Sequence, residues 1–206
     1  MEKRKIKNKS WFIIIGSFLF LIGLSLIGYD YFSNKNIKDI ENNALNDFYK
    51  HETVVNVDEF AEDTQVKEEV KEQVKIEYIA VLKIPKINLE RGLVNPNSYL
   101  NNVNYNVEIV KGSSMPDQEN GNVILAGHSG SARISYFKKL DNLSLGDMVY
   151  IDYNSKLYSY KVVDIYDIDK TGKAEIIRDK NKSTLTLITC RHNTKRQIVI
   201  ICELES

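Results

Sequence analysis

The chain has 206 residues, and its 28 Lys and Arg residues balance its 28 Asp and Glu residues, so the formal net charge at pH 7 is zero. This balance argues against nucleic-acid binding, which needs a surplus of basic side chains. Basic residues do cluster at the N-terminus, where membrane topology explains them. There are two cysteines, and a chain of this length needs no disulfide to hold its core.

A basic tail at residues 1–10 precedes an uncharged segment from Trp11 to Tyr29. These nineteen residues would span roughly 28 Å as an α-helix, close to the hydrocarbon thickness of a bilayer. We therefore expect a cytoplasmic tail, a single transmembrane helix over 11–32, and a cell-membrane protein whose remaining residues lie outside the cell. A cleaved signal peptide has a similar layout, but it usually has a shorter apolar core followed by small residues.

Residues 33–75 are rich in charged and amide side chains, which predicts an extracellular stalk. Within it Val66, Val70 and Val74 recur every four residues, a spacing that predicts one narrow amphipathic helix. Such a helix would be a solvated spacer, a coiled-coil contact or a segment folded over a substrate groove. The remaining residues, 76–206, are a normal size for one domain.

Alternating apolar and β-branched residues predict several strands in this domain. The predicted strands are Asn122 to Ala126, Met148 to Tyr153, Leu157 to Ile168, Thr184 to Cys190 and Gln197 to Cys202.

Cys190 ends its predicted strand, directly before the polar residues Arg191 to Thr194. A thiol in this position lies at the mouth of a loop, although a buried apolar role or a disulfide with Cys202 are alternatives. Cys202 lies within an apolar strand, so we expect it to be buried. Arg196 opens that strand, and a short hairpin would bring its cation near Cys190. Arg191 competes for this role, but alternation along a strand predicts that it points away.

A cysteine nucleophile needs a base, and the chain has three histidines. His51 lies in the polar stalk and is expected to be solvated. His192 is two residues from Cys190, where direct pairing is awkward. His128 follows an apolar strand and lies among Gly127, Ser129 and Gly130, which leave the imidazole accessible. His128 is therefore the expected partner of Cys190.

These residues resemble the sortases, membrane-anchored cysteine transpeptidases of Gram-positive bacteria. Residues Thr186 to Cys190 match the family's TLxTC signature, Ala126 to Ser129 match its histidine motif, and Arg196 stands where the family places its arginine. Tyr78 to Leu89 is similar to the first strand of a sortase domain. The resemblance covers residues 76–205. One departure is that five residues separate Cys190 from Arg196, fewer than in many sortases.

The resemblance implies a mostly β fold, an eight-stranded and largely antiparallel barrel with short helices. It also implies cleavage of an LPxTG-like sorting signal and transfer of the surface protein to an amine of the peptidoglycan precursor. Cys190 would be the nucleophile, His128 the general acid and base, and Arg196 the group that stabilises the oxyanion or the substrate. The substrate-binding residues would be Thr189, Ala126, Gly127 and Ser129.

No zinc or phosphate-binding motif is present in the sequence, and we expect no cofactor. Some class A sortases bind calcium through acidic loop residues; Glu108 and Glu175 are candidates here, but solvated side chains are the simpler interpretation. A C-terminal apolar anchor is not seen, which disfavours class C. The segment between Ile168 and Ser183 is too short for the long helix of class B, which leaves classes A, D and E.

Two other functions fit the same residues. A membrane-tethered β-barrel without catalytic activity could bind extended peptides. A cysteine protease could use the same three side chains and hydrolyse its thioester.

Overall fold

The computed structural model describes residues 5–54, 76–171, 173–191 and 193–205. It divides into two compact units, residues 1–43 and 44–206, which are described separately below. The first unit belongs to helix α1, which runs without a break from Lys5 to Val54. In this helix Trp11–His51 is long and apolar enough to cross a membrane; its apolar window of 18 residues has a mean hydropathy of 2.4, and none of that window is buried.

Helix α1 continues past the expected end of the transmembrane segment into the expected stalk. The composition changes near residue 33, yet no helix-breaking residue stands there, so the backbone need not change conformation. The helix predicted around Val66, Val70 and Val74 lies outside the described residues.

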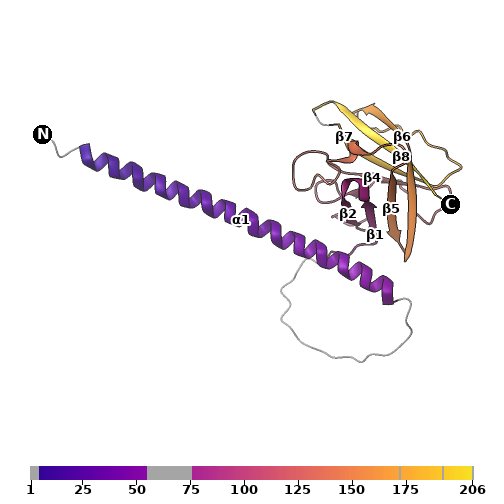
Figure 1. The fold of residues 1–206 in the computed structure, drawn as a ribbon, viewed down its shortest axis with the longest axis horizontal. Helices are drawn as coiled ribbons and strands as arrows, with labels where there is room; N and C mark the ends of the chain where they lie inside the picture. Colours follow the sequence, from indigo (N-terminus) through magenta and orange to yellow (C-terminus); the bar gives the residue numbers. More distant parts are fainter. Residues whose placement is uncertain (1–4, 55–75, 172, 192, 206) are drawn as a thin grey trace, which may run out of the picture. The chain divides into compact units, whose positions relative to one another are not determined.

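The second unit contains a mostly β domain whose eight described strands form a nearly closed barrel (Figure 1). The strand order around the sheet is β2-β1-β5-β6-β8-β7-β4-β3. The strands are β1 Ala80–Ile84, β2 Leu89–Leu93, β3 Glu108–Ile109, β4 Asn122–Ala126, β5 Met148–Tyr153, β6 Lys156–Asp169, β7 Thr184–Cys190 and β8 Arg196–Leu204. The two short helices of the domain are both 3₁₀ helices, η1 Pro85–Ile87 and η2 Leu140–Asn142. Among the pairings that are described, β4 with β7 is parallel and the others are antiparallel.

The prediction of one first strand from Tyr78 to Leu89 is wrong. Strand β1 ends at Ile84, the 3₁₀ turn η1 follows, and β2 returns antiparallel with Ile84 opposite Leu89. Pro85 has no N–H to donate to a ladder, which favours a turn at this point. Asn88 completes the turn in the left-handed region at φ 53°, a conformation that asparagine tolerates better than most residues.

The open edges of the barrel are joined by buried side chains. Arg91 on β2 donates from Nε to Oδ1 of Asn106 at 2.5 Å, and Asn106 donates from Nδ2 to the carbonyl of Gly92 at 2.9 Å. Arg91 and Asn106 are 7% and 3% exposed. Because Asn106 precedes β3, these bonds link the β2 edge to the chain that enters the opposite edge of the sheet.

The sheet packs apolar residues on both of its faces. The interior is filled by a large cluster that includes Leu82, Leu125, Leu187 and Ile200. On the opposite face a smaller cluster is made of Ile188, Val199 and Ile201, with Ile124, Tyr166, Ile168 and Ile176 against it. Ile176 belongs to the segment between β6 and β7. That segment therefore covers part of the outer face of the sheet.

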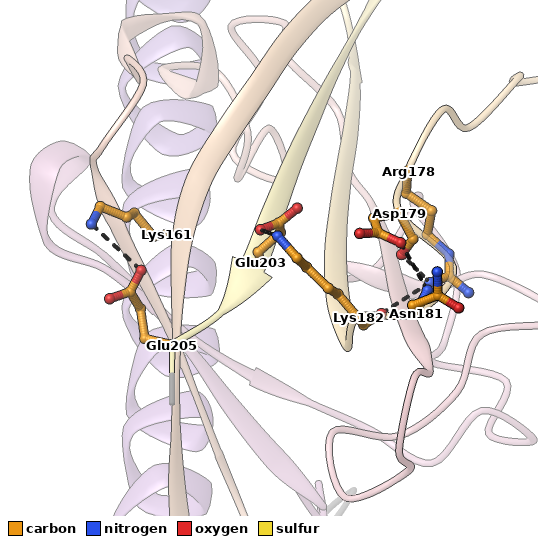
Figure 2. A network of polar contacts seen from close by, with 7 residues as sticks. All are labelled: Lys161, Arg178, Asp179, Asn181, Lys182, Glu203 and Glu205. Carbon is orange, nitrogen blue, oxygen red and sulfur yellow. Dashed lines mark hydrogen bonds and ion pairs between the residues drawn. The ribbon is translucent and has the colours of Figure 1, made fainter.

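Side-chain contacts hold this segment where it rejoins β7 (Figure 2). Arg178 donates to the carbonyls of Asp179 and Lys182, both at 3.1 Å. Lys182 pairs with Glu203 on β8 at 2.5 Å, and Lys161 pairs with Glu205 at 3.5 Å. Glu203 lies opposite Thr184, the first residue of β7. This polar network is thus at the far end of the strand from Cys190.

Candidate active site

Parallel pairing of β4 with β7 brings the histidine motif beside the cysteine. The register places Asn122 opposite Thr184 and Ala126 opposite Ile188. It continues beyond the strands, because the Gly127 N–H donates to the Ile188 carbonyl at 3.2 Å. His128 is two residues beyond Ala126, and Cys190 is two residues beyond Ile188. Both residues therefore lie at the same end of the two neighbouring strands.

Thr189 fastens these two strands together immediately before the site. Its hydroxyl donates to the carbonyl of Gly127 at 2.6 Å, and the side chain is only 4% exposed. A buried hydrogen bond of this kind is costly to break, since the carbonyl would be left without a partner. The bond holds the peptide before His128 against the residue before Cys190.

The loop that carries His128 is also held by Phe137. The Phe137 N–H donates to the His128 carbonyl at 3.0 Å. The Phe137 ring is fully buried and lies against Gly127, where an added Cβ would be 3.0 Å from ring carbons. The half-buried imidazole of His128 has its Nε2 3.5 Å from Oδ1 of Asn104. The histidine backbone is thus fixed by packing while its ring remains accessible.

Cys190 and Cys202 are both free thiols in contrasting surroundings. Cys190 is half-buried, whereas Cys202 is fully buried in the barrel interior, as expected. Burial raises the pKa of the Cys202 thiol to about 12. Cys202 lies opposite Leu185 and Cys190 lies opposite Gln197, so the two thiols are about 17 Å apart along the ladder. A disulfide between them is excluded by this separation.

The alternation of side chains along β7 determines the face of the sheet on which Cys190 lies. Leu185 and Leu187 pack in the interior, and Ile188 packs on the outer face, so Cys190 follows Ile188 to the outer face. On β4, Leu125 packs in the interior and Ile124 on the outer face, and the same alternation carried past the strand gives His128 the side of Cys190. The segment containing Ile176 covers this same face and lies beside the site.

Arg196 and Arg191 are at the turn between β7 and β8, and both contact Asp167 on β6. Arg191 donates from Nε to Oδ1 of Asp167 at 2.8 Å. Arg196 is exposed, and its Nη2 donates to the main-chain carbonyl of Asp167 at 3.3 Å. In the ladder Cys190 is opposite Gln197, the residue next to Arg196. Arg196 is therefore next to the ladder partner of Cys190 in the hairpin, and its guanidinium contacts the main chain of β6.

The other predicted site residues occupy the two neighbouring strand ends. Ala126 and Ser129 are half-buried, whereas Gly127 is buried. His51 is an exposed residue of α1. His192 lies outside the described residues.

Sequence reasoning missed the hydrogen bonds that pair β4 with β7. Oδ1 of Asn122 accepts from the hydroxyls of Thr184 at 3.0 Å and Thr186 at 2.9 Å, and all three side chains are buried. Three threonines on one apolar strand were the available signal, because a buried hydroxyl must find a partner. Asp167 was also missed; it lies in a strand of alternating acidic and apolar residues and is not marked by a motif.

The part of the chain that the structure describes contains no group of three or more His, Cys, Asp or Glu residues arranged to hold a metal ion. Glu108 accepts a hydrogen bond from the Val103 N–H at 3.3 Å. At Glu175 the main-chain carbonyl accepts from the Tyr166 hydroxyl at 3.0 Å. The absence of a cofactor stays a prediction.

A comparison with protein-family models matches residues 82–205 to the sortase domain. The chain belongs to the sortase family. Sortases are cysteine transpeptidases, so the chain is an enzyme of this kind. The matched range contains the strand ends that carry His128 and Cys190, and the β7–β8 hairpin that carries Arg191 and Arg196. It leaves out α1 and the residues that follow it.

Known sortases are similar to this one over most of its length. Sortase A of Bacillus anthracis is 26% identical over 213 aligned positions, which cover 97% of this chain and 95% of that protein. Among solved structures, sortase A of Corynebacterium diphtheriae has a TM-score of 0.54 at 23% identity and covers 64% of this chain. The match spans 62% of that C. diphtheriae chain, a little under two thirds.

Class C sortases are also among the structural neighbours. Sortase C1 of Streptococcus agalactiae has a TM-score of 0.54 at 25% identity, covering 63% of this chain and 68% of its own. Sortase C of Clostridium perfringens, solved with the C-terminal cell wall sorting motif, has a TM-score of 0.55 at 24% identity, covering 63% and 71%. Because class A and class C enzymes match equally well, the subclass of this sortase is not settled, and the expectation against class C gains no support.

Proposed function

We propose that this sortase cleaves a sorting signal of the LPxTG type through a thioacyl-enzyme and transfers the surface protein to a cell-wall amine. The observation that carries the proposal is the pairing of β4 with β7, which puts His128 and the half-buried Cys190 at the same end of two adjacent strands. A thiol and an imidazole on adjacent strands are what nucleophilic catalysis by cysteine requires.

In the first half-reaction the Cys190 thiolate attacks the threonine carbonyl carbon of the Thr-Gly bond. A carbon–sulfur bond forms and the carbon–nitrogen bond breaks, while His128 as imidazolium gives its proton to the departing amine. In the second half-reaction an acceptor amine attacks the thioester and the thiolate leaves. Neutral His128 takes the proton that the attacking amine loses, so each residue returns to its starting state.

Arg196 would stabilise the oxyanion or hold substrate carbonyls. The single contact described for its side chain uses one N–H on a main-chain carbonyl, and a guanidinium has five N–H donors. Most of its donors are therefore available to a substrate. Arg191 is the less suitable candidate because its guanidinium is already paired with the Asp167 carboxylate.

Residues around the two strand ends would contact the peptide. Ala126 and Ser129 are half-buried beside His128, and their accessible surface supports a substrate-binding role. Thr189 and Gly127 are buried and bonded to each other, so they would support the strand ends that carry His128 and Cys190.

We also propose that α1 anchors the enzyme in the cell membrane, with residues 1–10 in the cytoplasm and the barrel outside. The helix is long and apolar enough to cross a bilayer, and Lys and Arg residues are favoured on the cytoplasmic side of a span. The acceptor would then be a peptidoglycan precursor presented at the same surface. No metal ion or other cofactor takes part in the proposed reaction.

The test is to incubate the full-length enzyme in detergent with LPxTG-type peptides, with and without triglycine, and to identify the products by mass spectrometry. The expected result is a ligated product that is lost in Cys190→Ala and kept in Cys202→Ala, a matched removal of the buried thiol. Cleavage without ligation in the presence of several amines would instead indicate a protease. Peptide binding without any Cys190-dependent product would indicate a binding module.

A further inference from the structure

Asp167 on β6 accepts hydrogen bonds from both arginines of the β7–β8 hairpin. Its carboxylate Oδ1 lies 2.8 Å from Nε of Arg191, and its main-chain carbonyl lies 3.3 Å from Nη2 of Arg196. The two arginines are also joined to each other, since the Arg191 N–H donates to the Arg196 carbonyl at 2.9 Å. One residue of β6 therefore holds both sides of the hairpin that follows Cys190.

The two contacts differ in strength and in what they leave free. The Arg191 pair is charge-assisted, short and partly shielded, with side-chain exposures of 33% for Arg191 and 26% for Asp167. The Arg196 contact is longer, involves a neutral carbonyl, and lies on an exposed residue. Asp167 thus binds the guanidinium of Arg191 firmly and that of Arg196 lightly.

Asp167 is placed to influence the nucleophile because Arg191 directly follows Cys190 in the chain. Strand β8 lies between β6 and β7 in the sheet, so the Arg191 side chain extends past β8 to reach its partner. A fixed Arg191 side chain limits how far the end of β7 can move. The hairpin in this sortase is short, with five residues between Cys190 and Arg196, so a shift at Arg191 is transmitted to Arg196.

We propose that Asp167 is a positioning residue of this sortase, which tethers the hairpin through Arg191 and so places Cys190 and Arg196 for reaction with the peptide. The inference rests on the proposed transpeptidation. It assigns Arg191 to structure and Arg196 to the substrate. The tether acts on the chemical step, because it fixes reacting groups without contacting the peptide itself.

The test is a double-mutant cycle of Asp167→Asn, Arg191→Gln and their combination in the full-length enzyme. Asp167→Asn keeps the main-chain carbonyl that Arg196 contacts, so it removes only the ion pair. Each single variant is expected to lower kcat about 10-fold, since small misplacements of reacting groups are costly, with KM changed less than about 2-fold. The double variant is expected to be no slower than the slower single variant, because both changes remove the same tether.

A matched control is the ion pair of Lys83 with Asp152, at 3.4 Å and with side-chain exposures of 31% and 15%. It joins β1 to β5, away from the hairpin. Asp152→Asn and Lys83→Gln remove a comparable pair and should leave kcat unchanged. If Asp167→Asn does not fold, Asp167→Glu keeps the charge and should retain most of the activity.

Three outcomes would overturn the inference while leaving the proposed reaction intact: wild-type kcat in Asp167→Asn, losses that add in the double variant, or equal losses in the control pair. A wild-type enzyme that ligates no peptide would instead overturn the proposed reaction. The wild-type assay therefore separates failure of the tether from failure of the function.

Discussion

Cys190 and His128 are held by buried bonds, whereas the Arg196 guanidinium on the neighbouring β7–β8 hairpin is held by an exposed one. Between β4 and β7 the Thr189 hydroxyl bonds the Gly127 carbonyl at 2.6 Å, in a position that is 4% exposed. Between the hairpin and β6 the Arg196 guanidinium bonds a carbonyl at 3.3 Å on an exposed surface.

Burial changes what each contact can do. A hydrogen bond shielded from water has no alternative partner, so the strand ends that carry the proposed nucleophile and its proposed base are fixed as firmly as the fold itself. An exposed contact exchanges with water at little cost, which lets the arginine change partner when a peptide arrives. Substitutions that disturb the β4–β7 contacts should therefore lower stability and activity together. Substitutions of Arg196 in the hairpin should lower activity without lowering stability.

The largest effect is expected on the hairpin side and on activity alone. Replacing Arg196 with Gln should lower kcat/KM about 100-fold, the typical loss for one oxyanion donor. Steady-state kinetics with a sorting-signal peptide would measure it. The midpoint of thermal unfolding should stay within a degree or so of the wild type, because the residue is exposed.

Arg196→Lys is the informative companion variant. It keeps the charge but loses the fork of donors, so it should recover only part of the activity. An Arg196→Gln variant that lost stability in proportion to activity would contradict the separation of the two properties on this side.

At the β4–β7 strand ends, Gly127→Ala should lower both stability and activity. The added Cβ would be 3.0 Å from the buried ring of Phe137. Overpacking of this kind costs about 1–3 kcal/mol in the free energy of unfolding, measurable by urea denaturation. Turnover should fall as well, since His128 is the next residue. Wild-type turnover in a destabilised Gly127→Ala enzyme would break the coupling.

Two threonines of β7 offer a matched comparison of smaller effects. Thr189→Val removes the bond to the Gly127 carbonyl, and Thr186→Val removes a 2.9 Å bond to Asn122. Thr189→Val leaves the buried Gly127 carbonyl without that donor and should lower the free energy of unfolding by about 1–3 kcal/mol. Asn122 keeps its bond from Thr184 in the other variant, so Thr186→Val should cost about 0.5–1.5 kcal/mol.

Only Thr189→Val is expected to lower kcat, because its bond lies beside His128 while that of Thr186 lies further along the strand. Denaturation and kinetics on both variants would decide this. Equal kcat for the two would show that the position of a buried bond in β7 has no bearing on catalysis.

The smallest effect at neutral pH concerns the buried thiol. Burial raises the Cys202 pKa from 9.0 to about 12, so the folded state keeps the proton that the unfolded state releases above pH 9. This contribution to stability is present below pH 9 and is lost as the pH rises toward 12. Between pH 8 and 11 the free energy of unfolding, measured by denaturation, should fall less steeply with pH in Cys202→Ala than in the wild type.

Alkylation gives a second measurement on the same thiols. In the native enzyme iodoacetamide should modify Cys190 and spare Cys202, and in urea it should modify both. Modification of Cys202 in the native state, seen by peptide mass mapping, would show that the barrel interior opens readily.

Much of the barrel could be predicted from residue patterns. Strands β4, β5 and β7 begin and end where the alternation predicts, and β6 and β8 extend the predictions by one or two residues at each end. The first strand was wrong because the apolar pattern continues across Pro85 and Asn88, whose backbone preferences break it. The two-residue β3 is too short to have a pattern.

The residues of the candidate site could be predicted from the sequence, whereas the contacts that hold them in place could not. Cys190 and His128 stand beside recognisable apolar strands, and long-range pairing then brings them together. The parallel register of β4 and β7, the Thr189 bond and the contacts of Asp167 depend on residues far apart in the sequence. Local preference gives no information about such contacts, since tertiary packing determines them.

The bonds of Arg91 and Asn106 have a consequence beyond barrel geometry. An unpaired strand edge offers N–H and C=O groups to any extended chain, including a second copy of the same protein. Here Asn106 caps the Gly92 carbonyl on the β2 edge and is itself fixed by Arg91. In an enzyme whose proposed substrates are extended peptides, the β2 edge therefore offers such a chain one acceptor fewer at Gly92.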